Sequence, residues 1–532
     1  MNFVNKLAFF IIFVFFIFFI LLLHTLITQS VVIDIYKTLS NQYVLHVMLF
    51  TVWQSILSTF ISIIIAVPVG IAIFEKKNKF SLFLIDFSYI LQVIPALVIV
   101  FGIIAVFGNN GVINSVLQLI GLDQYSFQLY GLSGILLAHI YFNLPLATRF
   151  VYQGLSNIPN NYHSQSQVLG LRFLDNFKLI YWPFIVSELP KAAILIFVMS
   201  FTSFAIILTL GGGPKATTIG VAIYQFLMFN FDFGSATILG IIQVIVCSLA
   251  IYILNRKKTI VKEYSTKQIY KTKQKLSFRK SFLIYCILFI FGLFIFLPIL
   301  AVIIDGCNVN FFKSLSQSGL WLSLMNSLII GISSTILSFS ISIPIIFSLA
   351  NYKYHNKYKT GYLLLNTFPT LIMAIPSIII AACLFINLYQ YTNVFLTMFL
   401  VIIVNAIIMT PFIINFLSEP IYLTQLEVTK LCQTLGISGW RKLLLIDWLS
   451  LREVISKVIS FCIIFSFGDL SVIIFFGSQD FKTLPLYLYE LLGSYDIRSA
   501  GNISLFYLSS CVLIYLFIKF IFSGKLCFKS KT

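Results

Sequence analysis

The chain has 532 residues, of which 59% are hydrophobic and 10% are charged, and its mean hydropathy is +1.00. A soluble protein would carry about 25% charged residues, and here the apolar residues form runs of the roughly 20 residues that span a bilayer, so the composition excludes a soluble globular protein. It predicts an all-α polytopic membrane protein, in which the net charge of +18 reflects Lys and Arg gathered in cytoplasmic loops rather than nucleic-acid binding.

The first half of the chain holds six predicted membrane helices. Lys6 precedes the first apolar run, which places the N-terminus in the cytoplasm and is too long for a signal-peptide core. A basic inner loop at 75–79 and an outer segment at 108–130 without Lys or Arg support the same orientation. The six helices are predicted at 7–28, 49–74, 81–107, 132–151, 192–210 and 236–254.

A basic linker at 256–280 separates the halves. It carries ten Lys or Arg residues against the single acid Glu263, which marks a cytoplasmic segment beside lipid headgroups. The basic tail at 524–532 lies on the same side, so both termini are predicted to be cytoplasmic. Six further helices bring the predicted total to about twelve: 282–304, 323–350, 361–388, 394–417, 454–476 and 503–522.

The second half repeats the first. Gly, Pro, Trp and polar residues recur in register, most of them 266 residues apart, as Pro145 and Pro411 do. Upstream the spacing is 276 residues, as between Pro68 and Pro344, and Ile94-Pro95 recurs as Ile375-Pro376. Because each half has an even number of helices, we expect two parallel copies with the transport pathway between them.

Each half also carries one polar, helix-compatible segment between apolar runs, at 164–183 and at 430–449. Such a segment could be an interfacial helix without a partner, but its duplication in register favours a docking surface for a second subunit. A glycine in such a segment would allow a turn or a close approach of the backbone to a partner. Pro183 would mark the return to the membrane, because proline cannot continue a helix ladder.

The sequence contains no motif that would let this chain supply the energy for transport itself. A phosphate-cradling loop needs the pattern G-x-x-x-x-G-K-[ST], and the Gly-rich stretch at 211–218 lacks it. The eight Cys form no C-x-x-C pair, and the five His form no H-E-x-x-H, so neither a metal site nor a catalytic constellation is indicated.

The two polar segments resemble the cytoplasmic motif of ABC importer permeases, in which E-A-A is followed by three residues, Gly, nine residues and Ile-x-Leu-Pro. Residues 209–225, 435–448 and 466–496 resemble one branch in particular, the fused two-domain permeases for thiamine and thiamine pyrophosphate. Both copies depart from E-A-A itself. The resemblance assigns ATPase-coupling roles to Ser164, Gln165, Ser166, Gly170, Ile180, Trp182 and Pro183 in the first segment, and to Lys430, Leu431, Cys432, Gly436, Ile446 and Trp448 in the second.

The resemblance also implies an architecture and partners. It implies a type I ABC importer permease fold in the bacterial inner membrane, two copies of a separate ATPase that binds ATP with Mg²⁺, and a periplasmic thiamine-binding protein. No cofactor is expected on this chain. The implied permease domains are 47–255 and 323–523. An N-terminal helix and outer loop (1–46) precede the first, the linker (256–280) and a further helix and outer loop (281–322) precede the second, and the tail is 524–532.

Asp469 lies within an apolar stretch, where Ser203 is its counterpart. An intramembrane carboxylate is costly, so it could face the pathway and balance a cationic substrate, or neighbouring Ser466, Ser471 or backbone groups could satisfy it. For the small polar residues repeated in both halves, we prefer a role in helix packing to a role in substrate contact.

Other functions remain open at this point. Ferric-iron importers share the fused architecture. A secondary transporter would need ionisable groups in the membrane, for which Asp86 and Asp469 are the candidates. A membrane-bound enzyme lacks any supporting constellation.

Overall fold

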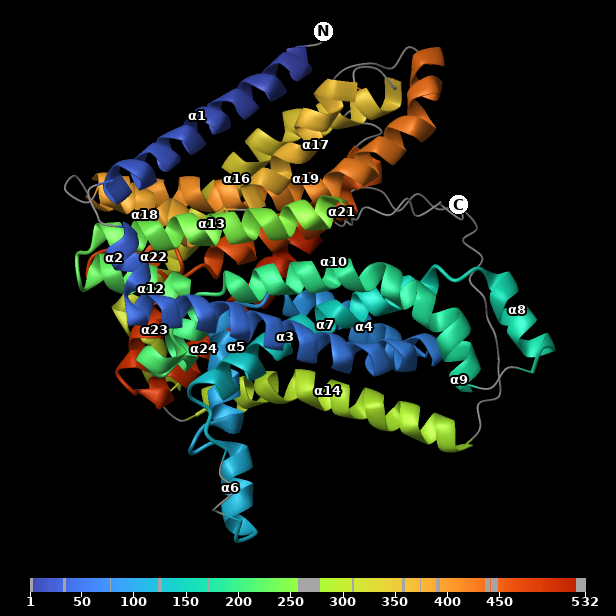
Figure 1. The fold of residues 1–532 in the computed structure, drawn as a ribbon, viewed down its shortest axis with the longest axis horizontal. Helices are drawn as coiled ribbons and strands as arrows, with labels where there is room; N and C mark the ends of the chain where they lie inside the picture. The colour runs from blue at the N-terminus through green and yellow to red at the C-terminus, as the bar shows by residue number, and fades with distance from the viewer. Residues whose placement is uncertain are drawn as a thin grey trace.

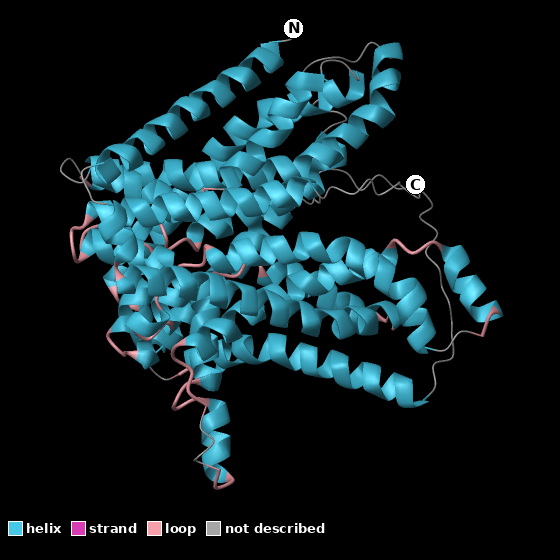
Figure 2. Cartoon of the chain, in the orientation of Figure 1, coloured by secondary structure: helices cyan, strands magenta, loops and turns pink. Residues whose placement is uncertain are grey.

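The computed structural model describes residues 3–31, 35–76, 78–122, 127–170, 173–256, 278–308, 311–355, 359–373, 375–388, 393–435, 441 and 448–522. Within these ranges the chain is helical, with short loops and no strand (Figure 2). Most of the linker at 256–280 and the whole tail at 524–532 lie outside them.

The first half contains the six predicted helices together with several short ones. Its elements are α1 (Phe3–Val31), α2 (Ile35–Ser40), α3 (Gln42–Glu75), α4 (Lys79–Leu91), α5 (Ala96–Phe107), α6 (Val112–Leu119), α7 (Leu132–Ser156), α8 (Asn160–Val168), α9 (Phe173–Asn176), the π-helix η2 (Phe177–Tyr181), α10 (Trp182–Phe201), α11 (Ala205–Leu210), the 3₁₀ turn η3 (Pro214–Ala216), α12 (Ile219–Met228) and α13 (Phe233–Arg256).

The second half repeats this order. Its elements are α14 (Phe278–Gly306), α15 (Phe311–Leu315), α16 (Ser318–His355), α17 (Lys359–Met373), α18 (Ser377–Leu388), α19 (Val394–Thr434), α21 (Trp448–Phe467), α22 (Ile473–Phe476), α23 (Leu484–Gly493) and α24 (Ile497–Phe522).

Ten helices of the described chain are long and apolar enough to cross a membrane, and the bent pair α17 and α18 makes an eleventh span. The remaining predicted span, at 454–476, corresponds to α21 and α22. Arg452, Glu453 and Lys457 lie in the first turns of α21, which makes this helix less apolar than its counterpart α10. The chain is therefore an all-α polytopic membrane protein, as predicted.

Four predicted helices proved to be broken rather than continuous. The helices predicted at 81–107 and 361–388 break just before Pro95 and Pro376, because proline lacks the N–H needed to continue the ladder. Those predicted at 192–210 and 454–476 break after Phe201 and after Phe467. Pro68 and Pro344, in contrast, lie inside the uninterrupted helices α3 and α16.

The first helix of each half packs against the other half. α1 contacts α16, α17 and α18 as well as α13, and α14 contacts α3 and α5 as well as α24. Figure 1 shows α1 and α14 along opposite edges of the bundle. Each half is therefore completed by a helix from the other.

Candidate functional site

The first coupling segment begins with α8, which stands apart from the end of the helical bundle (Figure 1). Pro159 precedes α8 and separates it from α7, because the residue before a proline is disfavoured in the helical conformation. Val168 and Leu169, at the C-terminal end of α8, are 87% and 71% exposed. Two large apolar side chains in the open at the end of a polar helix suit a protein partner better than water.

Gly170 ends α8. Its φ of +60° is in the left-handed region, and a Cβ built on it would meet no atom within 4 Å. Backbone conformation rather than crowding therefore requires glycine here. Among the other predicted residues of α8, Gln165 is exposed and its carbonyl accepts from the Leu169 N–H at 2.9 Å, whereas Ser166 is buried. The side chain of Ser164 is outside the described set.

The segment returns to the bundle through η2. Ile180 and Tyr181 are buried there, and the Tyr181 hydroxyl donates to the Glu75 carboxylate at the end of α3. Trp182 is 43% exposed, its ring 5.8 Å from that of Phe177. Pro183 is exposed in the first turn of α10, directly after η2, whose last bond runs from the Trp182 N–H to the Phe177 carbonyl. The end of the segment is thus held against the bundle by Ile180, as predicted, and by Tyr181, which the sequence analysis did not identify.

The second coupling segment is only partly described. α19 runs without interruption to Thr434, so Lys430, Leu431 and Cys432 form the end of a long helix. Of these, Cys432 is buried, and the side chains of the other two are outside the described set. Gly436 and Ile446 also lie outside the described residues. Trp448 opens α21, and its ring lies 5.3 Å from that of Phe522.

The broken helices of the two halves meet inside the membrane region. A Cβ on Gly468, directly after α21, would lie 3.1 Å from Cβ of Pro95, directly before α5. The break frees backbone carbonyls, and the Tyr507 hydroxyl donates to that of Phe467 at 2.7 Å. Contacts of α5 and α11 with α23 continue the interface between the halves.

Asp469 is engaged with its own turn. Oδ1 accepts from the backbone N–H of Ser471 at 3.1 Å and from its hydroxyl at 2.5 Å, and Oδ2 accepts from the Val472 N–H at 3.3 Å. The Ser471 hydroxyl lies 2.8 Å from that of Ser377, at the start of α18. The carboxylate therefore caps the turn before α22, as in the second of the two interpretations offered by the sequence.

A buried polar cluster holds three helices together in each half. In the first, Asn143 Nδ2 donates to Ser200 Oγ at 2.9 Å and to Ser58 Oγ at 3.4 Å, joining α7, α10 and α3. In the second, Asn405 Nδ2 donates to Ser466 Oγ at 2.9 Å, and Ser334 Oγ lies 2.9 Å from the same oxygen.

Ser58 and Ser200, and their second-half counterparts Ser334 and Ser466, thus serve in helix packing. The asparagines escaped the sequence analysis because Asn143 and Asn405 are 262 residues apart, one helical turn out of register with the repeat. An amide within an apolar helix was the available signal.

Comparison with known proteins agrees with this arrangement. Residues 60–257 match the family described as "Binding-protein-dependent transport system inner membrane component". The thiamine transport system permease protein ThiP of Escherichia coli K12 is 33% identical over 481 residues, covering 90% of this chain and 89% of the relative. ThiP of Brucella abortus is 34% identical over 472 residues, covering 87% and 85%.

The chain belongs to the ThiP family of transport permeases. It is accordingly the multi-pass inner-membrane component of an ABC transporter and is not itself an enzyme. Membership implies association with an ATPase and with a substrate-binding protein. A more distant relative, a PotC homolog from Mycoplasma genitalium named for spermidine/putrescine transport, is 23% identical and covers 39% of this chain.

Proposed function

We propose that this permease carries thiamine and its phosphates into the cytoplasm. The observation that carries the proposal is identity of 31–34% to thiamine transport permeases along about nine-tenths of the chain. A ferric-iron importer or an ion-coupled transporter is less favoured. Asp469, one of the two candidate ion-coupling residues, is already engaged by three hydrogen-bond donors.

Two copies of the ATPase would bind beneath the two coupling segments and supply Mg²⁺ and ATP. The exposed apolar end of α8 and the left-handed Gly170 support docking at the first segment. The repeat extends the same role to Lys430, Leu431, Cys432, Gly436, Ile446 and Trp448 in the second. ATP binding would draw the ATPases together and tilt one half against the other, which is coupling between distinct sites through a two-state element.

In this proposal both termini and both coupling segments face the cytoplasm. The opposite end of the bundle, where α2, α12 and α23 gather in Figure 1, would receive substrate from a periplasmic thiamine-binding protein. The permease domains would be 47–255 and 323–523, and the pathway would follow the interface at which Pro95 and Gly468 meet.

The proposal is tested by uptake of labelled thiamine, and separately of ferric iron, in cells with and without the chain. The double variant Gly170→Trp/Gly436→Trp alters both coupling segments. Gly121→Trp is the matched control, since Gly121 also has a left-handed φ of +75° with no atom near its absent Cβ but lies in the predicted outer segment.

We expect thiamine uptake to require the chain, to fall to background in the double variant and to persist in the control. Uptake of iron instead of thiamine would overturn the substrate assignment. Thiamine uptake that survives both the double variant and ATP depletion would overturn the coupling roles.

A further inference from the structure

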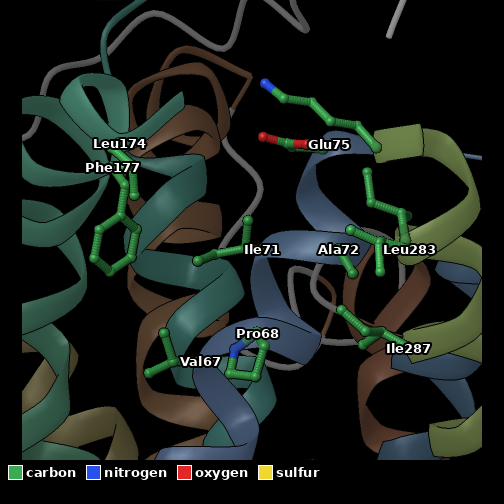
Figure 3. A pocket seen from close by; sticks show the side chains of 11 residues that line it. Val67, Pro68, Ile71, Ala72, Glu75, Leu174, Phe177, Leu283 and Ile287 are labelled. Atoms are coloured by element: carbon green, nitrogen blue, oxygen red, sulfur yellow. The ribbon is translucent and has the colours of Figure 1, made fainter. Parts of the chain in front are cut away.

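An open apolar groove runs between α3 and α14. One part of it, a pocket of about 510 Å³, includes Ile71, Ala72 and Leu283 in its lining; Figure 3 shows these side chains around the cavity. A second part of about 320 Å³ reaches Leu144 and Phe294. Pro68 and Ile287 line both parts, so we treat them as one feature, the α3–α14 groove.

The dimensions of the α3–α14 groove match one lipid tail. Its lining along α14 extends from Lys280 to Phe294, about 21 Å at 1.5 Å per residue. Half of a bilayer core is about 15 Å thick, so the groove would lead from headgroup level to the midplane. Apart from Glu75 and Lys280 at one end, all its lining side chains are apolar, which excludes a polar solute along its length.

The polar end of the groove is basic. Lys280 lines the pocket and Arg279 precedes it, while Lys76 donates to the Ser281 hydroxyl at 3.0 Å and lies 4.8 Å from the centre of the Tyr285 ring. Among the described residues that line the pocket, Glu75 is the carboxylate; it accepts from Tyr181 and faces Lys280. Three cations against one engaged carboxylate favour an anionic group at this end.

We propose that the α3–α14 groove is a binding site for an anionic phospholipid, with one acyl chain along α14 and the phosphate at Lys280. The assignment to the inner leaflet rests on the orientation proposed above, and the binding itself does not. Leu174 and Phe177 of the first coupling segment form one wall of the pocket, opposite Leu283 and Ile287 of α14 (Figure 3). A bound lipid therefore fills the space between α14 and the returning end of that segment.

The test is native mass spectrometry of the full chain, purified with its ATPase partner and titrated with palmitoyl-oleoyl phosphatidylglycerol or with the zwitterionic phosphatidylcholine of the same tails. Ile71→Phe fills the groove with the side chain that Phe347 provides at the equivalent position of the second half. Lys280→Glu reverses the charge at the polar end. Lys79→Glu, which reverses an exposed charge at the start of α4 outside the lining, is the matched control.

We expect at least one tightly retained phosphatidylglycerol and about tenfold weaker phosphatidylcholine binding, since each cation near the headgroup contributes several-fold. Lys280→Glu should remove the preference, Ile71→Phe should remove the retained lipid, and Lys79→Glu should do neither. Equal retention of both lipids by the unaltered chain, or unchanged retention in Lys280→Glu and a folded Ile71→Phe, would overturn the proposal. Since the assay uses no thiamine, failure of the substrate assignment would leave its result intact.

Discussion

The two halves of the permease build the segments that we propose as ATPase-coupling elements in different ways. In the first half α7 and α8 are separate helices, parted at Pro159, whereas in the second half the single helix α19 runs through the equivalent position, Gln425. Proline alone does not break such a helix, since α19 contains Pro411 and Pro420, but the position of Pro159 coincides with the gap between α7 and α8. The repeat thus keeps the position of the segment while changing how its helix is connected to the bundle.

The helix that each half receives from the other is also packed differently. In the second half, Phe9 of α1 contacts Tyr352 of α16 at a ring distance of 6.4 Å, and Phe15 contacts Phe368 of α17 at 5.2 Å. The Ser348 hydroxyl also donates to the Val4 carbonyl at 3.4 Å. In the first half the positions equivalent to Ser348 and Tyr352 are Ala72 and Lys76, and there the α3–α14 groove is open. Where Tyr352 packs against α1, Lys76 instead donates to the Ser281 hydroxyl of α14.

The largest effect should come from imposing the first half's break on the second. Gln425→Pro would remove a helix bond and clash within α19, which costs about 3 kcal/mol or more. We expect a marked fall in the thermal stability of the purified chain, together with loss of stimulation of the ATPase by substrate. Pro159→Gln is the reciprocal control and should be stable. Equal stability of Gln425→Pro and the parent would show that α19 need not be continuous.

The contact between the broken helices should be the next most sensitive. Gly468→Leu would drive a side chain into Pro95, and overpacking of this kind costs about 1–3 kcal/mol. Thiamine uptake should drop at least tenfold. Thr202→Leu, at the equivalent first-half position, already has a Cβ and should be affected less. A larger loss for Thr202→Leu would contradict the asymmetry of the interface.

The buried clusters allow a smaller comparison. Asn143→Ala removes donation to two serines, whereas Asn405→Ala removes donation to one, and hydrogen bonds between membrane helices contribute about 0.6 kcal/mol each. We expect Asn143→Ala to lower the unfolding temperature more. Measurement by differential scanning fluorimetry in one detergent would decide, and the reverse ranking would refute the role assigned to Ser58.

The smallest effect is expected at Asp469. Asp469→Asn keeps an oxygen for Ser471 but loses the acceptor for the Val472 N–H, which costs about 1 kcal/mol or less. Thiamine uptake should remain within about twofold of the parent when protein levels are matched, because ~1 kcal/mol removed from a stable fold leaves most chains folded. Loss of uptake at normal protein level would instead place the carboxylate on the pathway.

Much of this architecture could be predicted from the sequence because its signals are periodic. Long apolar runs, basic loops and the repeat of Pro145 as Pro411 indicated the helices and the two halves. The breaks after Phe201 and Phe467 were missed because the apolar character continues across them, and hydropathy does not register backbone geometry. Pro95 stands out in the sequence because Ile94-Pro95 recurs as Ile375-Pro376, but only its contact with Gly468 shows that it lies where the halves meet.

The residues of the candidate site also fall into those that the sequence reveals and those that only the structure reveals. Gly170 and Ile180 could be singled out because a motif fixes their spacing. The backbone of Gly170 is left-handed and Ile180 is buried, and their coupling roles stay predictions. Tyr181 could not be singled out, because its role depends on the distant Glu75 at the end of another helix. The outcome for Asp469 also required coordinates, since sequence alone does not reveal which neighbours supply hydrogen-bond donors.

The exchange of α1 and α14 between the halves has a consequence for biosynthesis. Phe15 leaves the ribosome long before Phe368, against which its ring packs. At about 5–20 residues per second, the 353 residues that separate them (368 minus 15) take roughly 20–70 s to translate. During that interval α1 can contact α13 but not its final neighbours in the second half. Helix α1 therefore has to persist in the membrane with one flank facing lipid until α16, α17 and α18 arrive, whereas the first half receives α14 soon after the linker.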